Sequence, residues 1–201
     1  MYWKGSDIER YRIAAKTERY CRPDFAKFIR RNETVHLDTK TFSQKPKILI
    51  RQTADRPIAA LDTEGVWFGR SIIAVMGGES PRYALQYLVG ILNSRLICHT
   101  YRKMVKEKGR VFAQVKLSKL KRIPIRTIDF DNKSDVERHN RIVALVDTIN
   151  ILNRTAEPLR TPTEKEAIQR QNDAVDRKID TLVYDLYGLD PSEIAIIEQN
   201  C

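Results

Sequence analysis

Apolar residues follow two different spacings along the chain, and the change between them separates two kinds of structure. From Lys47 to Met76, short apolar runs alternate with turn residues, which is typical of strands. From Ala84 onward, apolar residues recur every three or four positions, which is typical of amphipathic helices. The pattern predicts the α+β fold class, with a mixed, β-rich body followed by helices.

The β-rich part is expected to contain several short strands. Its apolar runs are rich in β-branched residues and are separated by the turn pairs Glu64-Gly65 and Gly77-Gly78. The predicted strands are Lys47–Arg51, Ile58–Asp62, Val66–Phe68 and Ser71–Met76. Before them, we expect a short strand or turn around residues 8–13 and a short helix in PDFAKFIRRN, residues 23–32.

A long amphipathic helix is predicted to follow the strands and pack on them. Ser80 supplies a capping hydroxyl, and Pro81 has no amide hydrogen to leave unpaired. Between Ala84 and Met104, five apolar residues share one helical face: Leu85, Leu88, Val89, Leu92 and Leu96. After the break at Gly109, we expect a strand over residues 111–115 and a helical turn with an extended proline segment over residues 117–125.

The last third of the sequence predicts an antiparallel helical hairpin. Two amphipathic runs, Val136–Asn153 and Glu164–Tyr187, each follow a capping-box pattern, which is Ser134 with Glu137 and Thr163 with Glu166. Gly188 is a left-handed cap, and Asp190-Pro191 starts a terminal helix that runs to Gln199. We therefore expect a β-rich part in residues 1–130 and a helical part in residues 131–201.

Positive charge is concentrated in the first two-thirds of the chain. The formal net charge is +10, yet residues 1–133 contain 28 basic and 13 acidic residues, and residues 134–201 contain 8 and 13. Between Arg95 and Arg126, eleven basic residues stand against one acid, Glu107. Basic side chains that neutralise phosphates release condensed counterions, so this run favours a polyanionic partner over a merely solvated surface.

Catalytic motifs are absent from the sequence. It contains no P-loop, no GxGxxG after a strand, no GxSxG and no HExxH, and its three histidines are isolated. Three widely spaced cysteines, Cys21, Cys98 and Cys201, suit a reducing cytoplasm and not a disulfide framework. No apolar stretch approaches the roughly 20 residues that cross a bilayer, so no membrane partner is expected.

One pattern resembles a nuclease metal site. Asp24 and Asp38 could hold Mg²⁺ while Lys40 supports the attacking water. Such short acid–acid–lysine matches arise by chance in a chain that is 31% charged. A magnesium-dependent nuclease is therefore kept as an alternative, as is a protein-interaction module formed by the hairpin residues Val143, Val146, Ile149, Leu182 and Leu186, which are otherwise expected to form an intramolecular seam.

Duplex DNA binding is the preferred interpretation. Arg and Lys hold phosphates, and Arg and Gln also form paired hydrogen bonds with base edges in the major groove. The expected DNA-binding residues come from the strand–turn region and from the segment behind the long helix: Arg51, Gln52, Arg56, Arg70, Arg102, Lys106, Lys108, Arg110, Gln114, Lys116 and Lys119. Among these, phosphate contacts are expected first from the cluster between Lys106 and Lys119, while Trp67 and Phe68 are expected to be core residues.

The same segments carry a family resemblance. YALQYLVGILNSRLICHTYRKM (residues 83–104) and KGRVFAQVKLSKLKRIPI (residues 108–125) resemble the TaqI-like C-terminal specificity domain of type II restriction–modification enzymes and adenine-specific DNA methyltransferases. KGSDIERYRI (residues 4–13) is similar to the start of that domain, and KIDTLVYDLYGLDPSEIAIIE (residues 178–198) to its end. The motifs are the helix YL-x-G-x-LNS and the segment L-x-x-L-x-x-IPI.

The resemblance implies a target-recognition domain that reads duplex DNA for an adenine-N6 methyltransferase. In the family, S-adenosylmethionine binds a separate catalytic domain that carries an asparagine–proline–proline–aromatic motif. This chain has neither that motif nor a glycine-rich donor loop, so no cofactor is expected in it. The expected partners are double-stranded DNA and a methyltransferase catalytic domain, in the same or another chain. When recognition and catalysis lie in separate domains, the recognised sequence can change while base flipping and methyl transfer remain in the catalytic domain.

Overall fold

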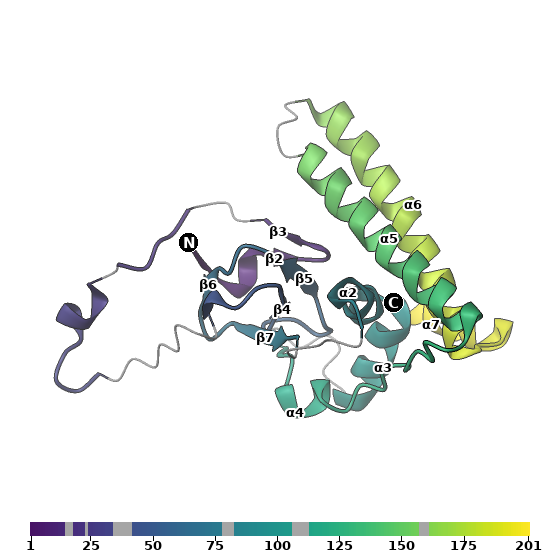
Figure 1. The fold of residues 1–201 in the computed structure, drawn as a ribbon, viewed down its shortest axis with the longest axis horizontal. Coiled ribbons are helices and arrows are strands. Elements are labelled where there is room, and N and C mark those ends of the chain that lie inside the picture. Colours follow the sequence, from purple (N-terminus) through teal and green to yellow (C-terminus); the bar gives the residue numbers. More distant parts are fainter. Residues whose placement is uncertain (15–17, 23, 34–41, 78–82, 106–112, 157–160) are drawn as a thin grey trace.

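The protein combines a small sheet, a helix that packs on it, shorter helices beside that helix and a long helical hairpin (Figure 1). This computed structural model describes residues 1–14, 18–22, 24–33, 42–77, 83–105, 113–156 and 161–201. The hairpin of α5 (Lys133–Ala156) and α6 (Pro162–Tyr187) lies on one side of the sheet, and residues 18–22 and 24–33 project on the other side (Figure 1). The predicted α+β class is confirmed.

A three-stranded antiparallel sheet forms the centre of the β-rich part. The central strand β4 (Lys47–Arg51) pairs with β5 (Ala59–Asp62) on one side and β7 (Ile72–Met76) on the other. In the register, Leu49 of β4 is opposite Ala60 and Ala74. All three strands lie within one residue of the predicted bounds, because their apolar runs cover the two buried faces.

Short N-terminal elements complete the sheet layer. Strand β1 (Tyr2–Trp3) pairs in parallel with β6 (Trp67–Phe68), and β2 (Ile8–Glu9) forms a hairpin with β3 (Arg12–Ile13). A 3₁₀ turn, η1 (Gly5–Asp7), connects β1 to β2. The short helix expected in residues 23–32 is only a 3₁₀ turn, η2 (Phe25–Phe28), because its three apolar residues find no core to pack against.

The predicted long helix is two helices that meet at Ser94. Helix α2 (Leu85–Asn93) begins later than predicted, and Ser80 and Pro81 lie outside the described residues. Ser94 is extended, with φ −65° and ψ 155°, and helix α3 (Arg95–Val105) starts directly after it. The Ser94 hydroxyl donates to the Ile91 carbonyl and accepts from the Ile97 amide, so one side chain ends one helix and begins the next.

Two residues of the YL-x-G-x-LNS motif connect α2 to its neighbours. A Cβ at Gly90 would stand 2.7 Å from Cγ2 of Ile142, so the glycine allows close approach of the hairpin. The buried Asn93 amide donates to the Ala59 carbonyl and accepts from the Ala59 amide, both at 2.9 Å. The motif is therefore architectural, since it fixes α2 between the sheet and the hairpin.

Residues 113–125 are less regular than predicted. The strand expected over residues 111–115 is not formed at 113–115, where the Val115 amide makes a single bond to the Gln52 carbonyl. Residues 111 and 112 lie outside the described residues. The expected helical turn is confirmed as α4 (Leu117–Leu120), followed by Pro124.

The C-terminal hairpin is confirmed, with shifted helix starts. Helices α5 (Lys133–Ala156), α6 (Pro162–Tyr187) and α7 (Pro191–Asn200) follow one another. Asn132 rather than Ser134 caps α5, since its side chain accepts from the amides of Ser134 and Asp135. Thr161 rather than Thr163 caps α6, because Pro162 occupies the first helical position. The caps at Gly188 and Asp190 are confirmed.

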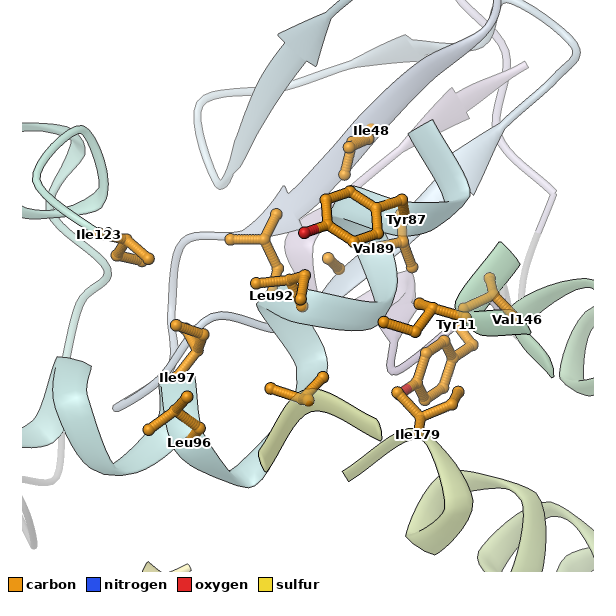
Figure 2. Close-up of a cluster of buried hydrophobic side chains, with 14 of the residues drawn as sticks. Tyr11, Ile48, Tyr87, Val89, Leu92, Leu96, Ile97, Ile123, Val146 and Ile179 are labelled. Atoms are coloured by element: carbon orange, nitrogen blue, oxygen red, sulfur yellow. The ribbon is translucent and has the colours of Figure 1, made fainter. Parts of the chain in front are cut away.

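One hydrophobic core joins the sheet to the base of the hairpin. Ile48 of β4, Tyr87 and Val89 of α2, Val146 of α5 and Ile179 of α6 belong to the same buried cluster, which Figure 2 shows. The expected intramolecular seam is confirmed, since Val146, Ile149 and Leu186 are buried in the cluster and Val143 and Leu182 pack against it. These residues are thus not available as a docking surface for another chain.

The cysteine prediction requires a correction. Cys98 of α3 and Cys201 form a disulfide, whereas Cys21 is free. Residues 103 positions apart meet because α7 packs against α3, a tertiary contact that cysteine spacing does not reveal. Among the described helices, none is long and apolar enough to span a bilayer.

Candidate nucleic-acid interface

Three segments from distant parts of the sequence meet at the end of β4. The Gln52 amide donates to the Ser71 carbonyl at 2.9 Å, and the Gln52 carbonyl accepts from the Val115 amide at 2.7 Å. Backbone bonds therefore place residue 52, the turn before β7 and the stretch before α4 side by side. We call this junction the β4 corner, and define it by Arg51, Gln52, Arg70, Gln114 and Lys116.

The β4 corner brings together five of the predicted DNA-binding residues. Arg70, Gln114 and Lys116 are exposed, and Arg51 and Gln52 are half-buried. The Nε of Arg51 donates to the Thr53 carbonyl at 2.9 Å, which fixes the guanidinium close to its own turn. Residues with two amide side chains and three cations thus lie near one end of the central strand, a combination that suits base edges bordered by phosphates.

Helix α4 adds further basic residues next to the β4 corner. The Lys116 amide donates to the hydroxyl of the buried Tyr101 at 2.7 Å, so the start of α4 is fixed against α3. Lys119 is half-buried, while Lys121 and Arg122 are exposed in the turn that follows. Lys121 and Arg122 were not among the expected DNA-binding residues, although they belong to the same basic run in the sequence.

Two predicted residues lie instead on the side of the molecule where α3 packs against α7. Arg102 forms an ion pair with Asp55 at 2.7 Å and donates to the Asn200 carbonyl at 2.8 Å. Arg56 contacts the Cys98 sulfur, and burial followed by repulsion from Arg10 and Arg102 lowers the pKa of its guanidinium. Both side chains therefore have intramolecular partners on the α3–α7 side.

The remaining predicted cations, Lys106, Lys108 and Arg110, lie outside the described residues. Of the nuclease pattern, Asp38 and Lys40 also lie outside them. Asp24 is described and pairs with Arg22 at 3.1 Å. In the described part of the chain, no group of three or more His, Cys, Asp or Glu side chains is placed to bind a metal ion.

An aromatic group lies beside the β1–β6 pair. Phe42 stacks on Trp67 with ring centroids 5.3 Å apart and meets Phe68 edge-on at 4.9 Å. Trp67 and Phe68 are half-buried, and Phe68 packs against the smaller hydrophobic cluster around Trp3. Phe42, which the sequence pattern did not single out, thus holds the end of the segment before β4 to the sheet.

A buried ion pair orders the loop before β6. Lys47 and Asp62 are opposite each other in β4 and β5, and Nζ of Lys47 lies 2.5 Å from Oδ2 of Asp62. The Asp62 carboxylate also accepts from the amides of Glu64, Gly65 and Val66. Lys47 is fully buried, so it serves the loop and not a phosphate.

Comparison with known proteins agrees with a recognition role. The chain matches the TaqI-like C-terminal specificity domain over residues 1–125. It is therefore a domain of the class that sets DNA sequence specificity in restriction–modification enzymes. Because the match covers more than half of its 201 residues, the chain belongs to the TaqI-like C-terminal specificity domain family. Among curated proteins, no match to this chain was found.

The family match includes the sheet, α2, α3 and α4. Every residue of the β4 corner therefore lies within it. It ends at Ile125, before the hairpin, so the similarity expected for residues 178–198 lies outside the matched range.

Proposed function

We propose that this chain reads a short duplex DNA sequence on behalf of an adenine-N6 DNA methyltransferase. The observation that carries the proposal is the β4 corner. There, backbone bonds bring together three segments that contain two glutamines and three cations, at the end of the central strand. A convergence of hydrogen-bonding amides with cations supports both base reading and phosphate binding.

Within this site, the two kinds of side chain have different tasks. Gln52 and Gln114 contact base edges, and adenine is the base that offers a glutamine one acceptor and one donor in the major groove. Arg70, Lys116 and Lys119 contact phosphates, joined by Lys121 and Arg122 of the turn after α4. Phosphate contacts orient the duplex, and the glutamines select the sequence.

Methyl transfer is assigned to a catalytic domain outside this chain, either in the same polypeptide or in a partner. That domain binds S-adenosylmethionine, and the present chain presents the target to it. An intracellular DNA substrate implies that both act in the cytoplasm. Any DNA cleavage by the parent enzyme would likewise belong to its catalytic part and not to this chain.

Selection from a random duplex pool tests the proposal directly. The full chain should enrich one short motif, and Gln52→Ala or Gln114→Ala should relax selection at single positions by about 1–3 kcal/mol each. Gln171→Ala, a change of an exposed glutamine on α6, is the matched control and should leave the motif unchanged. Recovery of no motif by the wild-type chain would contradict sequence reading.

A second measurement separates phosphate binding from base reading. Lys116→Ala with Lys119→Ala should weaken binding to all duplexes alike. The log–log slope of affinity against salt should become shallower by about 0.9 for each phosphate that the variant no longer neutralises. A change of sequence preference in that variant would instead assign base contacts to these lysines.

A further inference from the structure

The segment between Arg19 and Phe42 leaves the sheet and returns to nearly the same place. At its start, the Arg19 carbonyl accepts from the Tyr2 amide at 2.7 Å, and the Arg19 guanidinium pairs with Asp7. At its end, Phe42 stacks on Trp67, which is paired with Tyr2 in the β1–β6 ladder. Both ends are thus anchored at β1 and β6, and residues 20–22 and 24–33 project away from the body (Figure 1).

The described tip of this projection is basic and exposed. Residues 25–32 contain Lys27, Arg30 and Arg31 and no acid, and all three cations are exposed. Within the described part of the chain, none of the three forms an ion pair. Glu33 is turned back to the Arg30 amide at 3.0 Å.

Apolar side chains accompany these cations without a core to bury them. Tyr20 is 65% exposed and Phe28 is 56% exposed. The Arg22 guanidinium lies 4.0 Å from the centre of the Phe28 ring, so it shields one face of the ring. These exposed apolar side chains lie on the same projecting segment as the cations, so the segment offers a ligand both charge and apolar surface.

We propose that residues 20–22 and 24–33, which we call the basic arm, bind the DNA backbone beside the sequence read at the β4 corner. The inference rests on the proposed function and adds a second contact to it. The tip of the arm, residues 25–32, holds three cations and no acid, so it favours a polyanion, and the same charges disfavour pairing of the arm with a second copy of itself. Phe28 and Tyr20 can rest on sugars or enter a groove, as apolar side chains of other DNA-binding arms do.

The root of the basic arm is connected to the β4 corner. The Gly69 amide donates to the Trp3 carbonyl, and the Gly5 amide donates to the Ser71 hydroxyl at 2.8 Å. Ser71 in turn accepts from the Gln52 amide through its carbonyl. A duplex bound at Arg70 and Gln52 therefore passes the root of the arm.

Chain geometry limits how far the arm can reach. Twenty-two residues lie between Arg19 and Phe42. With both ends anchored, half of them lead out and half return, so the tip lies at most about 36 Å from the root. That distance is about one turn of B-DNA, or about 10 base pairs. The arm should consequently need flanking duplex beyond the recognised sequence.

The test combines two proteins with two DNA lengths. The arm variant carries Lys27→Ala, Arg30→Ala and Arg31→Ala in the full chain. The short duplex contains the selected motif with about two flanking base pairs, and the long one adds about ten on each side. Wild type should bind the long duplex more tightly than the short one, with a steeper salt dependence. The arm variant should lose this gain, and its log–log salt slope on the long duplex should fall by about 2–3.

Two further variants separate the arm from general charge effects. Lys165→Ala, Arg170→Ala and Lys178→Ala on α6 remove the same charge from exposed positions on the hairpin and should retain the gain from the long duplex. Lys27→Arg, Arg30→Lys and Arg31→Lys should also retain it, because the charge is conserved. Unchanged melting temperatures confirm that each variant is folded.

An arm variant that matches wild type on both duplexes would overturn the proposal, and so would an equal loss in the α6 variant. If the wild-type chain selects a motif and the arm variant binds both duplexes as wild type does, only the proposal for the basic arm is refuted. A wild-type chain that binds no duplex at all refutes the proposed function as well.

Discussion

Arg10 and Asp176 form a two-point ion pair across 166 positions of sequence. Nη1 of Arg10 lies 2.8 Å from Oδ2 of Asp176, and Nη2 donates to Oδ1 at 2.8 Å. The same Nη2 donates to the Asn93 carbonyl at 2.7 Å, and the Tyr11 hydroxyl donates to Asp176 at 2.7 Å. This cluster joins the β2–β3 hairpin to the end of α2 and to α6, so it fixes the direction in which the helical hairpin leaves the recognition body.

Removal of the Asp176 carboxylate should destabilise the fold. Asp176→Ala leaves Arg10 and the buried Tyr11 hydroxyl without their acceptor, and we expect a loss of about 2–4 kcal/mol in the free energy of unfolding. Chemical denaturation measures it. Asp185→Ala is the matched control on the same helix, because the Asp185 side chain is 59% exposed in its pair with Arg138 and should cost below about 1 kcal/mol. Equal losses of unfolding free energy would show that the Arg10–Asp176 cluster stabilises the fold no more than an exposed ion pair does.

Asp180 should make stability depend on pH. Burial is the main cause that raises its pKa from 3.8 to about 6. The hydrogen bond from the Arg95 amide opposes this rise, the Asp176 charge adds to it, and the charges of Arg10 and Arg95 lower the pKa again. The folded state therefore holds this proton more tightly. Its contribution to stability is present below pH 4 and is lost as pH rises to about 6, amounting to about 3 kcal/mol.

Asp180→Asn isolates this effect, because the Arg95 amide keeps its acceptor at that position. The difference in unfolding free energy, wild type minus variant, should fall between pH 4 and pH 6 and stay constant above. Denaturation curves at several pH values measure it. A difference that is the same at every pH would show that Asp180 titrates as an ordinary carboxyl.

Asn93 should be essential to the packing of α2 on the sheet. Asn93→Ala leaves the Ala59 amide and carbonyl without partners in a buried place, and we expect a loss of about 2–5 kcal/mol. Alanine favours helices more than asparagine does, so the loss cannot come from helix propensity. Thermal unfolding measures the change. A variant as stable as wild type would mean that water or a new contact replaces the amide.

Gly90 should tolerate no side chain while Ile142 is present. A methyl group there favours the helix by about 1 kcal/mol but overpacks the α2–α5 contact, which costs about 1–3 kcal/mol. We expect Gly90→Ala to be destabilising overall. Ile142→Ala should cost less in the Gly90→Ala background than in wild type, and a double-mutant cycle measures that coupling. Strict additivity would show that the two sites do not touch.

Much of the secondary structure follows from local sequence. The strand Lys47–Arg51 and the caps at Gly188 and Asp190 lie where they were predicted, because a buried apolar run or a cap depends on residues only a few positions away. The break at Ser94 was not predicted. Beside the local bonds of the Ser94 hydroxyl, distant groups contact this break, since Asp180 accepts from the Arg95 amide and the Arg10 guanidinium donates to the Asn93 carbonyl.

The candidate site likewise has features that the sequence predicted and features that depend on tertiary contacts. The sequence by itself determined that the first two-thirds is basic, that its residue types suit DNA, and that its motifs resemble a specificity domain. Only the tertiary structure decided which of these side chains share a surface. Backbone bonds gather Gln52, Arg70 and Gln114, while Asp55 and the end of α7 engage Arg102. Charge is a property of each residue, but its availability depends on partners brought close by folding, and these partners lie up to about a hundred positions away.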